Sequence, residues 1–475
     1  RALSDYGVPA NAFNPDYIPG GSSSGSAVVT AAGMVSFALG TDTAGSGRVP
    51  ACFHNIYGVK PSLGLLSTRG VVPACATLDT ISLFTFTADD AEKVLSITAT
   101  YDDQCAWSRE HRFSVHGKRY GTAPKMFRFG VPLASQWQTD AAYTKGMHQA
   151  IAELEAIGGI KVELDCSPLL SAARLLYEGP WVAERYHVIH ELMESHPEAV
   201  HPVTFKITQG GSTPLAVDAF DARYKLAEFK RQADALIGQV DVMLSPTTVT
   251  HPSKAEVAAD PIGVNSRLGT WTNFMNLLDY SALAVPIGFT EQELPVGVTL
   301  FGRAFDDLTL LSLARALETR LMLPLGATGV AHPALSEHLT TAQNGTMELV
   351  VCGAHLQGLP LNHQLIERGG VLVSTTHSAP RYKLFALAGG PPKRPAMVRD
   401  THGQSIEVEV WRLPSETLGS FLAGIPAPLG LGQVELADGS WKCGFICTAG
   451  ALNEDGDAED VTEFGSWREW LTLQS

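Results

Sequence analysis

Two serines lie in glycine-rich segments of the chain, 24 residues apart. Residues 20–27 read GGSSSGSA, residues 40–51 read GTDTAGSGRVPA, and each segment runs into an apolar stretch that favours a helix. Glycine lets backbone N–H groups gather around one point, and helix N-termini direct further donors there. Such donors can stabilise negative charge that develops on an oxygen, with Ser46 as the nucleophile. Either segment alone is equally consistent with a phosphate-binding loop or a structural turn.

A third motif makes the pattern more specific. Residues 58–62 read GVKPS and follow the two serine segments in order. The three pieces together resemble the amidase signature family, whose pattern is GGSS(G/S)GS, then GTDxxGSxRxP, then GxKPS or GxKPT. Residues 78–80 and 87–91 are also similar to that family's continuation. An ordered set of motifs is a much stronger signal than one glycine-rich loop.

The resemblance implies a Ser-Ser-Lys triad and assigns roles to particular residues. Ser46 is the nucleophile, and Ser22, which follows a cis peptide bond, passes the proton to a lysine base. In the family this lysine precedes the serine-rich loop, whereas Lys60 matches a structural lysine. The chain opens at Arg1, so we expect the N-terminal part of the amidase domain, lysine included, to be missing and the chain alone to be inactive or impaired. The expected oxyanion donors are the backbone N–H groups of Thr43, Ala44, Gly45 and Ser46.

Residues 177–186 and 272–281 resemble segments of allophanate hydrolases. Allophanate is a small anion, and its carboxylate requires a cation; Arg185 supplies a forked contact and Tyr177 a hydroxyl donor. These two residues are eight positions apart and share one helix face if Gly179 and Pro180 do not break the helix. Spacing alone favours an exposed arginine and a core tyrosine. The implied acyl transfer requires no metal and no organic cofactor.

The C-terminal part carries a second candidate site. Residues 350–362 predict a strand that enters a tight loop with glycines, and the segment resembles the γ-glutamylcyclotransferase-like fold. In allophanate hydrolases the equivalent domain is associated with decarboxylation of the amidase product, and its key histidine matches His355. Asn362 and Tyr382 are further candidates for that pocket. Residues 421–432 show no counterpart of the usual cyclotransferase glutamate, so cyclotransferase activity is not expected. Taken alone, His355 is also consistent with a structural histidine that closes the loop.

The elements that must position these residues follow from hydrophobic periodicity. Helical patterns at 141–157, 169–193, 216–237 and 308–317 alternate with apolar strands at 127–133, 160–164, 240–244 and 280–289. This alternation predicts an α/β fold with a mixed sheet between helices, which is also the amidase-signature core. After residue 347 short β runs predict a small β-rich domain, a partly closed barrel. We therefore expect an amidase domain at 1–326, a linker at 327–346 and a decarboxylation domain at 347–475.

Bulk composition excludes several classes of partner. The chain has 475 residues, 45% of them hydrophobic, and a formal net charge of −15 without a basic stripe, so nucleic acid and anionic membranes are not expected partners. Neither a membrane-spanning run nor a signal peptide is apparent. Seven scattered cysteines favour reduced thiols in the cytoplasm.

The sequence thus predicts an allophanate hydrolase that releases ammonia and N-carboxycarbamate, followed by decarboxylation, with ammonia and carbon dioxide as net products. The family resemblance further implies a homodimer and contact with urea carboxylase. Two alternatives stay open: another amidase-signature hydrolase that acts on a different small amide, and a non-catalytic scaffold.

Overall fold

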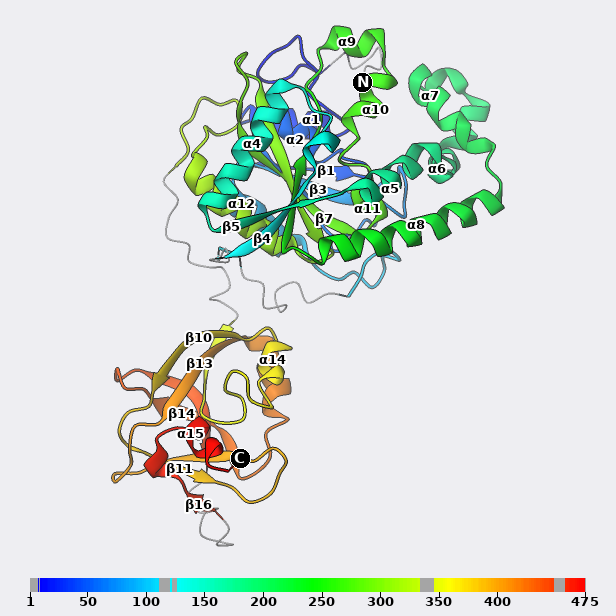
Figure 1. Cartoon of the computed structure of the whole chain (residues 1–475). Coiled ribbons are helices and arrows are strands. Elements are labelled where there is room, and N and C mark those ends of the chain that lie inside the picture. Colours follow the sequence, from blue (N-terminus) through cyan, green and yellow to red (C-terminus); the bar gives the residue numbers. More distant parts are fainter. Residues whose placement is uncertain are drawn as a thin grey trace. The chain divides into compact units, whose positions relative to one another are not determined.

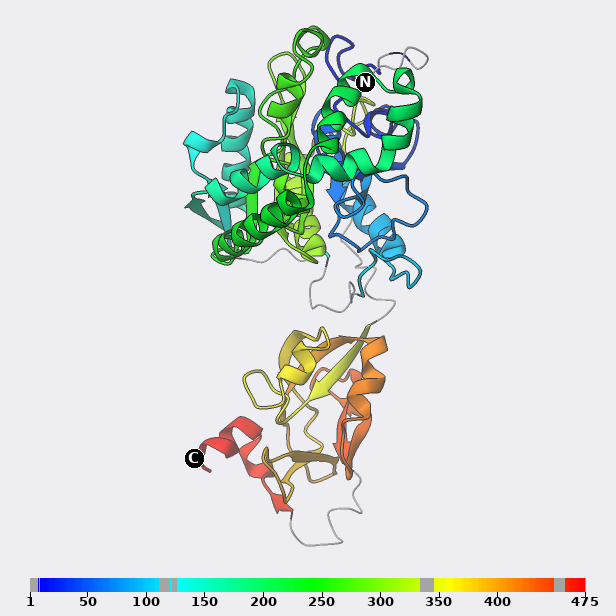
Figure 2. The same cartoon turned by 90° about the vertical axis from the view of Figure 1, so that its right-hand side faces the viewer.

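The computed structural model describes residue 7 and residues 9–110, 120–121, 126–333, 346–447 and 458–474. The described residues divide into two compact units (Figures 1 and 2), one up to residue 333 and one from residue 346. The predicted linker at 327–346 falls mainly on residues 334–345, which lie outside the described residues.

The first unit is built on an eight-stranded mixed sheet in the order β1-β3-β2-β7-β8-β6-β4-β5. Strand β4 runs parallel to β5 and β6, and the other neighbours are antiparallel. The two long central strands β7 and β8 are buried along nearly their whole length, which explains their continuous apolar sequence. The strands are β1 (Phe37–Asp42), β2 (Tyr57–Lys60), β3 (Thr80–Thr85), β4 (Phe127–Pro132), β5 (Gly159–Leu164), β6 (Val242–Pro246), β7 (Tyr280–Phe289) and β8 (Pro295–Arg303).

Helices cover both faces of this sheet; Figure 1 shows α4 and α12 on one side and α5, α8 and α11 on the other. Side-chain caps begin several of the helices; at α3 Thr87 accepts from the Asp90 N–H, and at α4 Asp140 accepts from the Tyr143 N–H. The helices are α1 (Ser24–Ala31), α2 (Val49–Cys52), α3 (Ala88–Thr98), α4 (Ala141–Ala156), α5 (Ser167–Glu178), α6 (Trp181–Ser195), α7 (Pro202–Gln209), α8 (Ala216–Ile237), α9 (Lys254–Ala259), α10 (Gly263–Leu268), α11 (Phe274–Leu277) and α12 (Asp307–Leu321).

One predicted helix is divided in two. The helical pattern at 169–193 breaks at Gly179 and Pro180, so that α5 ends at Glu178 and α6 begins at Trp181. Proline cannot donate a backbone hydrogen bond, and glycine is a common residue just beyond a helix end. The condition for Tyr177 and Arg185 to share one helix face is therefore not met, because they lie on different helices.

The second unit is β-rich, but its strands form two sheets rather than the predicted partly closed barrel. A five-stranded sheet has the order β10-β13-β9-β15-β14, and a three-stranded sheet the order β12-β11-β16. Trp467 and Trp470 are buried in the core from the C-terminal helix α15, drawn in red in Figure 2. The elements are β9 (Thr346–Val351), α13 (His363–Ile366), β10 (Val371–His377), β11 (Tyr382–Ala386), β12 (Pro395–Arg399), β13 (Glu407–Pro414), α14 (Ser415–Leu422), β14 (Leu429–Glu435), β15 (Trp441–Cys447), β16 (Glu459–Asp460) and α15 (Trp467–Thr472).

Within the described residues, every helix is too short or too polar to cross a lipid bilayer.

Two buried histidines hold the segment that leads to the serine-rich loop. The His54 ring bonds the carbonyl of Pro50 at 2.8 Å through Nδ1 and accepts from the Ala12 N–H at 3.3 Å through Nε2. A carbonyl can only accept and an N–H can only donate, so these partners require the neutral ring. His251 stacks on Phe53 with ring centroids 3.7 Å apart and bonds the Ile18 carbonyl. Burial lowers the pKa of each histidine from 6.5 to about 4.

We predict that the free energy of unfolding falls as pH drops from 6.5 toward 4. Above pH 6.5 both rings are neutral in the folded and unfolded chain; below it the unfolded chain binds protons that the folded one excludes. At the lower limit the loss is on the order of 3 kcal/mol for each histidine. Urea denaturation at pH 7.5, 6.5 and 5.5 measures how the free energy of unfolding depends on pH. His54→Gln should make the dependence shallower, and the exposed control His187→Gln should not; equal slopes for wild type and His54→Gln would contradict the account.

Candidate active site

The structure brings the two predicted serines together. Ser22 follows a cis peptide bond with Gly21 and lies two residues before α1, whereas Ser46 lies in the turn between β1 and α2. The Ser22 hydroxyl donates to the Ser46 hydroxyl at 3.0 Å. Ser22 is exposed and Ser46 is half-buried, so a substrate can reach both. This geometry allows a proton to pass directly from one hydroxyl to the other.

The neighbouring serines attach this loop to β1. The Ser23 hydroxyl donates to the Thr41 carbonyl and accepts from the Thr41 N–H, both at 3.1 Å. The Ser26 hydroxyl donates to the Leu39 carbonyl at 2.7 Å. These contacts join the two segments that carry Ser22 and Ser46.

A buried ion pair organises the turn of Ser46. Arg48 donates to both carboxylate oxygens of Asp42, from Nε at 2.9 Å and from Nη2 at 3.0 Å, and both side chains are fully buried. The same carboxylate accepts from the N–H groups of Gly45 at 2.7 Å and Gly47 at 3.0 Å. Burial alone would raise the pKa of Asp42, but Arg48 and these hydrogen bonds hold it below its usual value. The turn is therefore wrapped around a charged carboxylate.

The segment at 272–281 supports this turn from the other side. The Thr272 hydroxyl donates to the Ala44 carbonyl at 2.7 Å, and the Asn276 amide donates to the Asp42 carbonyl at 2.8 Å. Gly45 has a φ of +117°, and a Cβ at this position would lie 2.4 Å from the Thr272 hydroxyl oxygen. Only glycine fits this position.

One predicted oxyanion donor is already occupied. The Gly45 N–H donates to Asp42, so the expectation that it binds an oxyanion is wrong for this geometry. The N–H groups of Thr43, Ala44 and Ser46 have no acceptor among the residues that the structure describes. These three remain candidate donors.

Lys60 is buried, and its ammonium donates to the carbonyls of Pro61 and Tyr280, both at 2.8 Å. Burial lowers its pKa to about 8. Across the described residues, no lysine is hydrogen-bonded to Ser22 or Ser46. The ammonium of Lys60 is therefore bound to backbone carbonyls and not to either serine.

Tyr177 and Arg185 meet although they belong to different helices. The Arg185 guanidinium carbon lies 5.0 Å from the centre of the Tyr177 ring. Arg185 Nε is buried and has no hydrogen-bond partner among the described residues. The same helices contribute Leu175 and Trp181 to a hydrophobic cluster that includes Ala44 of the nucleophile turn. The pair thus lies beside the turn of Ser46, with an unused donor.

Sequence reasoning missed the residues that connect these helices to the turn. The Glu184 carboxylate accepts from the Thr77 N–H at 2.8 Å, the Thr77 hydroxyl at 2.6 Å and the Cys75 thiol at 3.1 Å. Asp79 accepts from the Thr43 hydroxyl and from the Cys75 N–H. The loop at 74–79 therefore links α6, and Arg185 with it, to the turn of Ser46. The position of Glu184 next to Arg185 was the available signal in the sequence.

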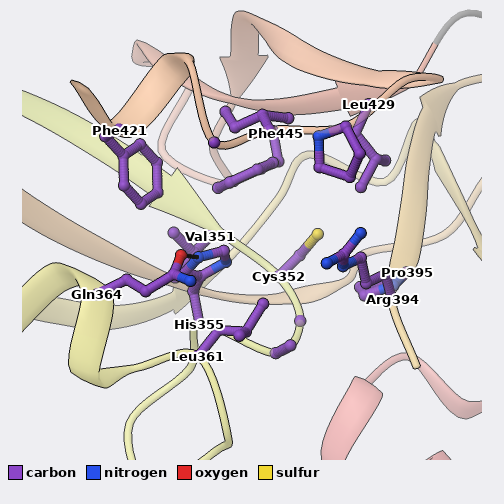
Figure 3. Close-up of a pocket in the computed structure, with 15 residues that line it drawn as sticks. Val351, Cys352, His355, Leu361, Gln364, Arg394, Pro395, Phe421, Leu429 and Phe445 are labelled. Carbon is purple, nitrogen blue, oxygen red and sulfur yellow. Dashed lines mark hydrogen bonds between the residues drawn. The ribbon is translucent and has the colours of Figure 1, made fainter. Parts of the chain in front are cut away.

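The second unit holds a pocket around His355 (Figure 3). His355 bonds Gln364 at 3.1 Å and packs against both Phe421 and Phe445, whose ring centroids lie 5.2 and 5.1 Å from its own. Burial lowers the pKa of His355, and nearby Arg394 acts in the same direction. Sequence reasoning missed Gln364 and Arg394, which both line this pocket.

The two other predicted pocket residues lie elsewhere. Tyr382 is buried in the hydrophobic core, its hydroxyl accepts from the Glu435 N–H at 2.8 Å, and it does not line the described pocket. Asn362 does not line it either, but its amide donates to the His355 carbonyl at 3.0 Å and supports the loop from behind. Buried Glu409 holds the other end of that loop by accepting from the Gln357 N–H at 2.8 Å. Tyr382 is therefore a packing residue.

With this geometry established, comparison with known proteins identifies the class. The amidase family profile matches residues 3–311, and the profile of the allophanate hydrolase C-terminal domain matches residues 347–472. The chain belongs to the amidase family, and it carries this C-terminal domain after the amidase region.

Its similarity to particular proteins extends along nearly the whole chain. It is 39% identical to the urea amidolyase of Saccharomyces cerevisiae and 37% identical to that of Lachancea kluyveri, over 99% and 98% of this chain. Each alignment covers 26% of the relative, so the chain spans about a quarter of their length. The structure of Kluyveromyces lactis allophanate hydrolase matches with a TM-score of 0.75 and 37% identity, over 99% of this chain and 78% of that one. The chain is allophanate hydrolase-like in both of its units.

We predict that Asp42→Asn destabilises the first unit by about 3–5 kcal/mol, because it leaves the Arg48 charge buried and uncompensated. The free energy of unfolding from urea denaturation measures the effect. The matched control is Glu163→Gln, which removes the exposed pair between Lys161 and Glu163 and should cost about 0–1 kcal/mol. A loss for Asp42→Asn no larger than that of the control would show that the ion pair does not organise the turn.

Proposed function

We propose that the chain carries the residues that hydrolyse allophanate. The observation that carries the proposal is the buried, unpartnered Nε of Arg185 beside Tyr177, next to the turn of the paired serines. An unused arginine donor near a nucleophile suits a small amide that ends in a carboxylate. The similarity to allophanate hydrolase and urea amidolyase over nearly the whole chain supports the same substrate.

In this proposal Arg185 and Tyr177 hold the allophanate carboxylate and place the terminal amide carbonyl over Ser46. Ser46 attacks that carbonyl while its proton passes to Ser22 and on to the lysine base that the family resemblance implies. The N–H groups of Thr43 and Ala44 stabilise the oxyanion. The C–N bond breaks, ammonia leaves with the transferred proton, and water then releases N-carboxycarbamate from the acyl-enzyme.

The second unit is proposed to decarboxylate this product. The C–N bond to one carboxylate breaks, its electron pair stays on nitrogen, the nitrogen takes up a proton, and carbon dioxide leaves. His355 is the residue that moves this proton in the pocket, and the apolar walls made by Phe421 and Phe445 favour neutral carbon dioxide over the starting anion.

Three further expectations stay proposals. A cytoplasmic location agrees with seven free cysteines among the described residues. Homodimerisation follows from the family resemblance, and size-exclusion chromatography with light scattering tests it. Contact with urea carboxylase is the third proposal, and it follows from the family resemblance.

Arg185→Ala distinguishes allophanate from an uncharged amide. In the natural protein, we predict that this variant lowers kcat/KM for ammonia release from allophanate by about 100-fold, because a charged contact is lost. Biuret carries an amide in place of the carboxylate, and its hydrolysis should change far less. The rate of ammonia release from each substrate measures how much more the variant loses with allophanate than with biuret.

Two controls complete this test. Arg174→Ala removes an exposed arginine on α5, the helix that carries Tyr177, and should leave both substrates unaffected. Ser46→Ala should abolish ammonia release from both. Equal losses for allophanate and biuret in Arg185→Ala would overturn the substrate, and full activity of Ser46→Ala would overturn the chemistry.

A further inference from the structure

The pocket of the second unit has an unusual charge balance. No acidic side chain is among its described lining residues, and Arg394 is the only lining residue with a permanent charge. His355 is held toward its neutral form by burial. Arg394 is therefore the lining side chain that can supply a counter-charge to an anion in this pocket.

Arg394 is free to make this contact. Its guanidinium has no hydrogen-bond or ion-pair partner among the described residues, whereas neighbouring Lys393 lies 4.9 Å from the centre of the Trp470 ring. In Figure 3 Arg394 lies beside Cys352, across the pocket from Gln364. The positive charge of Arg394 thus lies on one side of His355, and Gln364 lies on the other.

Local packing explains why Arg394 lies at this place. Pro395 begins β12 directly after Arg394 and packs on Gly353, where a Cβ would lie 2.0 Å from the proline ring. Gly353 therefore has to be glycine, and its absent side chain lets the segment with Arg394 reach the rim of the loop. The loop of His355 and the segment of Arg394 fit together as one unit.

The same loop offers backbone donors. The N–H groups of Gly353, Ala354 and His355 have no acceptor among the described residues, and all three residues line the pocket. Successive free N–H groups in a turn form a site for an anion. A guanidinium on one side and these donors on the other provide separate places for two carboxylates.

We propose that Arg394 is the anchor for one carboxylate of a small dicarboxylate in this pocket, with the loop at 353–355 as the site for the other. This inference rests on the proposed decarboxylation, because N-carboxycarbamate is such a dicarboxylate. It adds a binding residue that holds one carboxylate in place while the other departs as carbon dioxide near His355.

The test uses malonate, a stable dicarboxylate in which a methylene replaces the N–H of N-carboxycarbamate. Isothermal titration calorimetry is carried out on the whole chain with Arg185→Ala, so that the first unit does not contribute an anion site. We expect Arg394→Gln to weaken malonate binding by at least about 30-fold, and Arg394→Lys to restore part of it. The matched control Lys393→Gln, one residue away, should change the affinity by less than about threefold.

Circular dichroism of each variant verifies that the second unit is folded. Malonate binding that is equal in Arg394→Gln and Lys393→Gln, or absent from the Arg185→Ala parent, would overturn the proposal. Neither outcome affects ammonia release at Ser46, so failure of this inference and failure of the amidase proposal are distinguishable.

Discussion

Two opposite charges, Asp42 and Arg48, are buried beneath the turn of Ser46, and the arrangement of the first unit's site depends on them. Removal of a carboxylate and a guanidinium from water costs several kcal/mol for each ion, and only close hydrogen bonding offsets it. Here the carboxylate accepts two bonds from Arg48 and two from backbone N–H groups of the same turn. Because the turn itself provides these donors, the ion pair cannot form without the turn, and the turn keeps Ser46 within 3.0 Å of Ser22.

Two further carboxylates extend this framework from the nucleophile to the proposed substrate anchor. Asp79 accepts a hydrogen bond from the hydroxyl of Thr43 in the turn of Ser46. Glu184 accepts a hydrogen bond from the N–H of Thr77, which lies in the same loop as Asp79. Glu184 is adjacent to Arg185 on α6. A small substrate that reaches from Ser46 to Arg185 requires these two positions to stay at a constant separation, and a hydrogen-bonded loop between them provides that constraint.

The serine pair could be predicted from sequence because its motifs lie within 32 residues and carry their own turn-forming glycines. The alternating strands and helices of the first unit were predictable for a similar reason, since each shows its own periodicity. Contacts that form only in the folded chain were not predictable in this way, whether the residues are near or far apart in the sequence. That Gly45 donates to Asp42 depends on the folded turn, and the break between α5 and α6 was left open by the motif. Tyr382 was a candidate for the pocket, yet its side chain belongs to the core. Arg394 reaches the pocket because Pro395 packs on a glycine more than 40 positions earlier.

The central claim is that Ser46 and Arg185 bind opposite ends of one substrate, and a crystal structure of the Ser46→Ala variant with allophanate tests it most directly. The account predicts the terminal amide carbonyl over residue 46, with its oxygen toward the N–H groups of Thr43 and Ala44. The carboxylate should lie against the Arg185 guanidinium and within reach of the Tyr177 hydroxyl. Density for allophanate with its carboxylate away from Arg185, or with no substrate carbonyl near residue 46, would contradict the account.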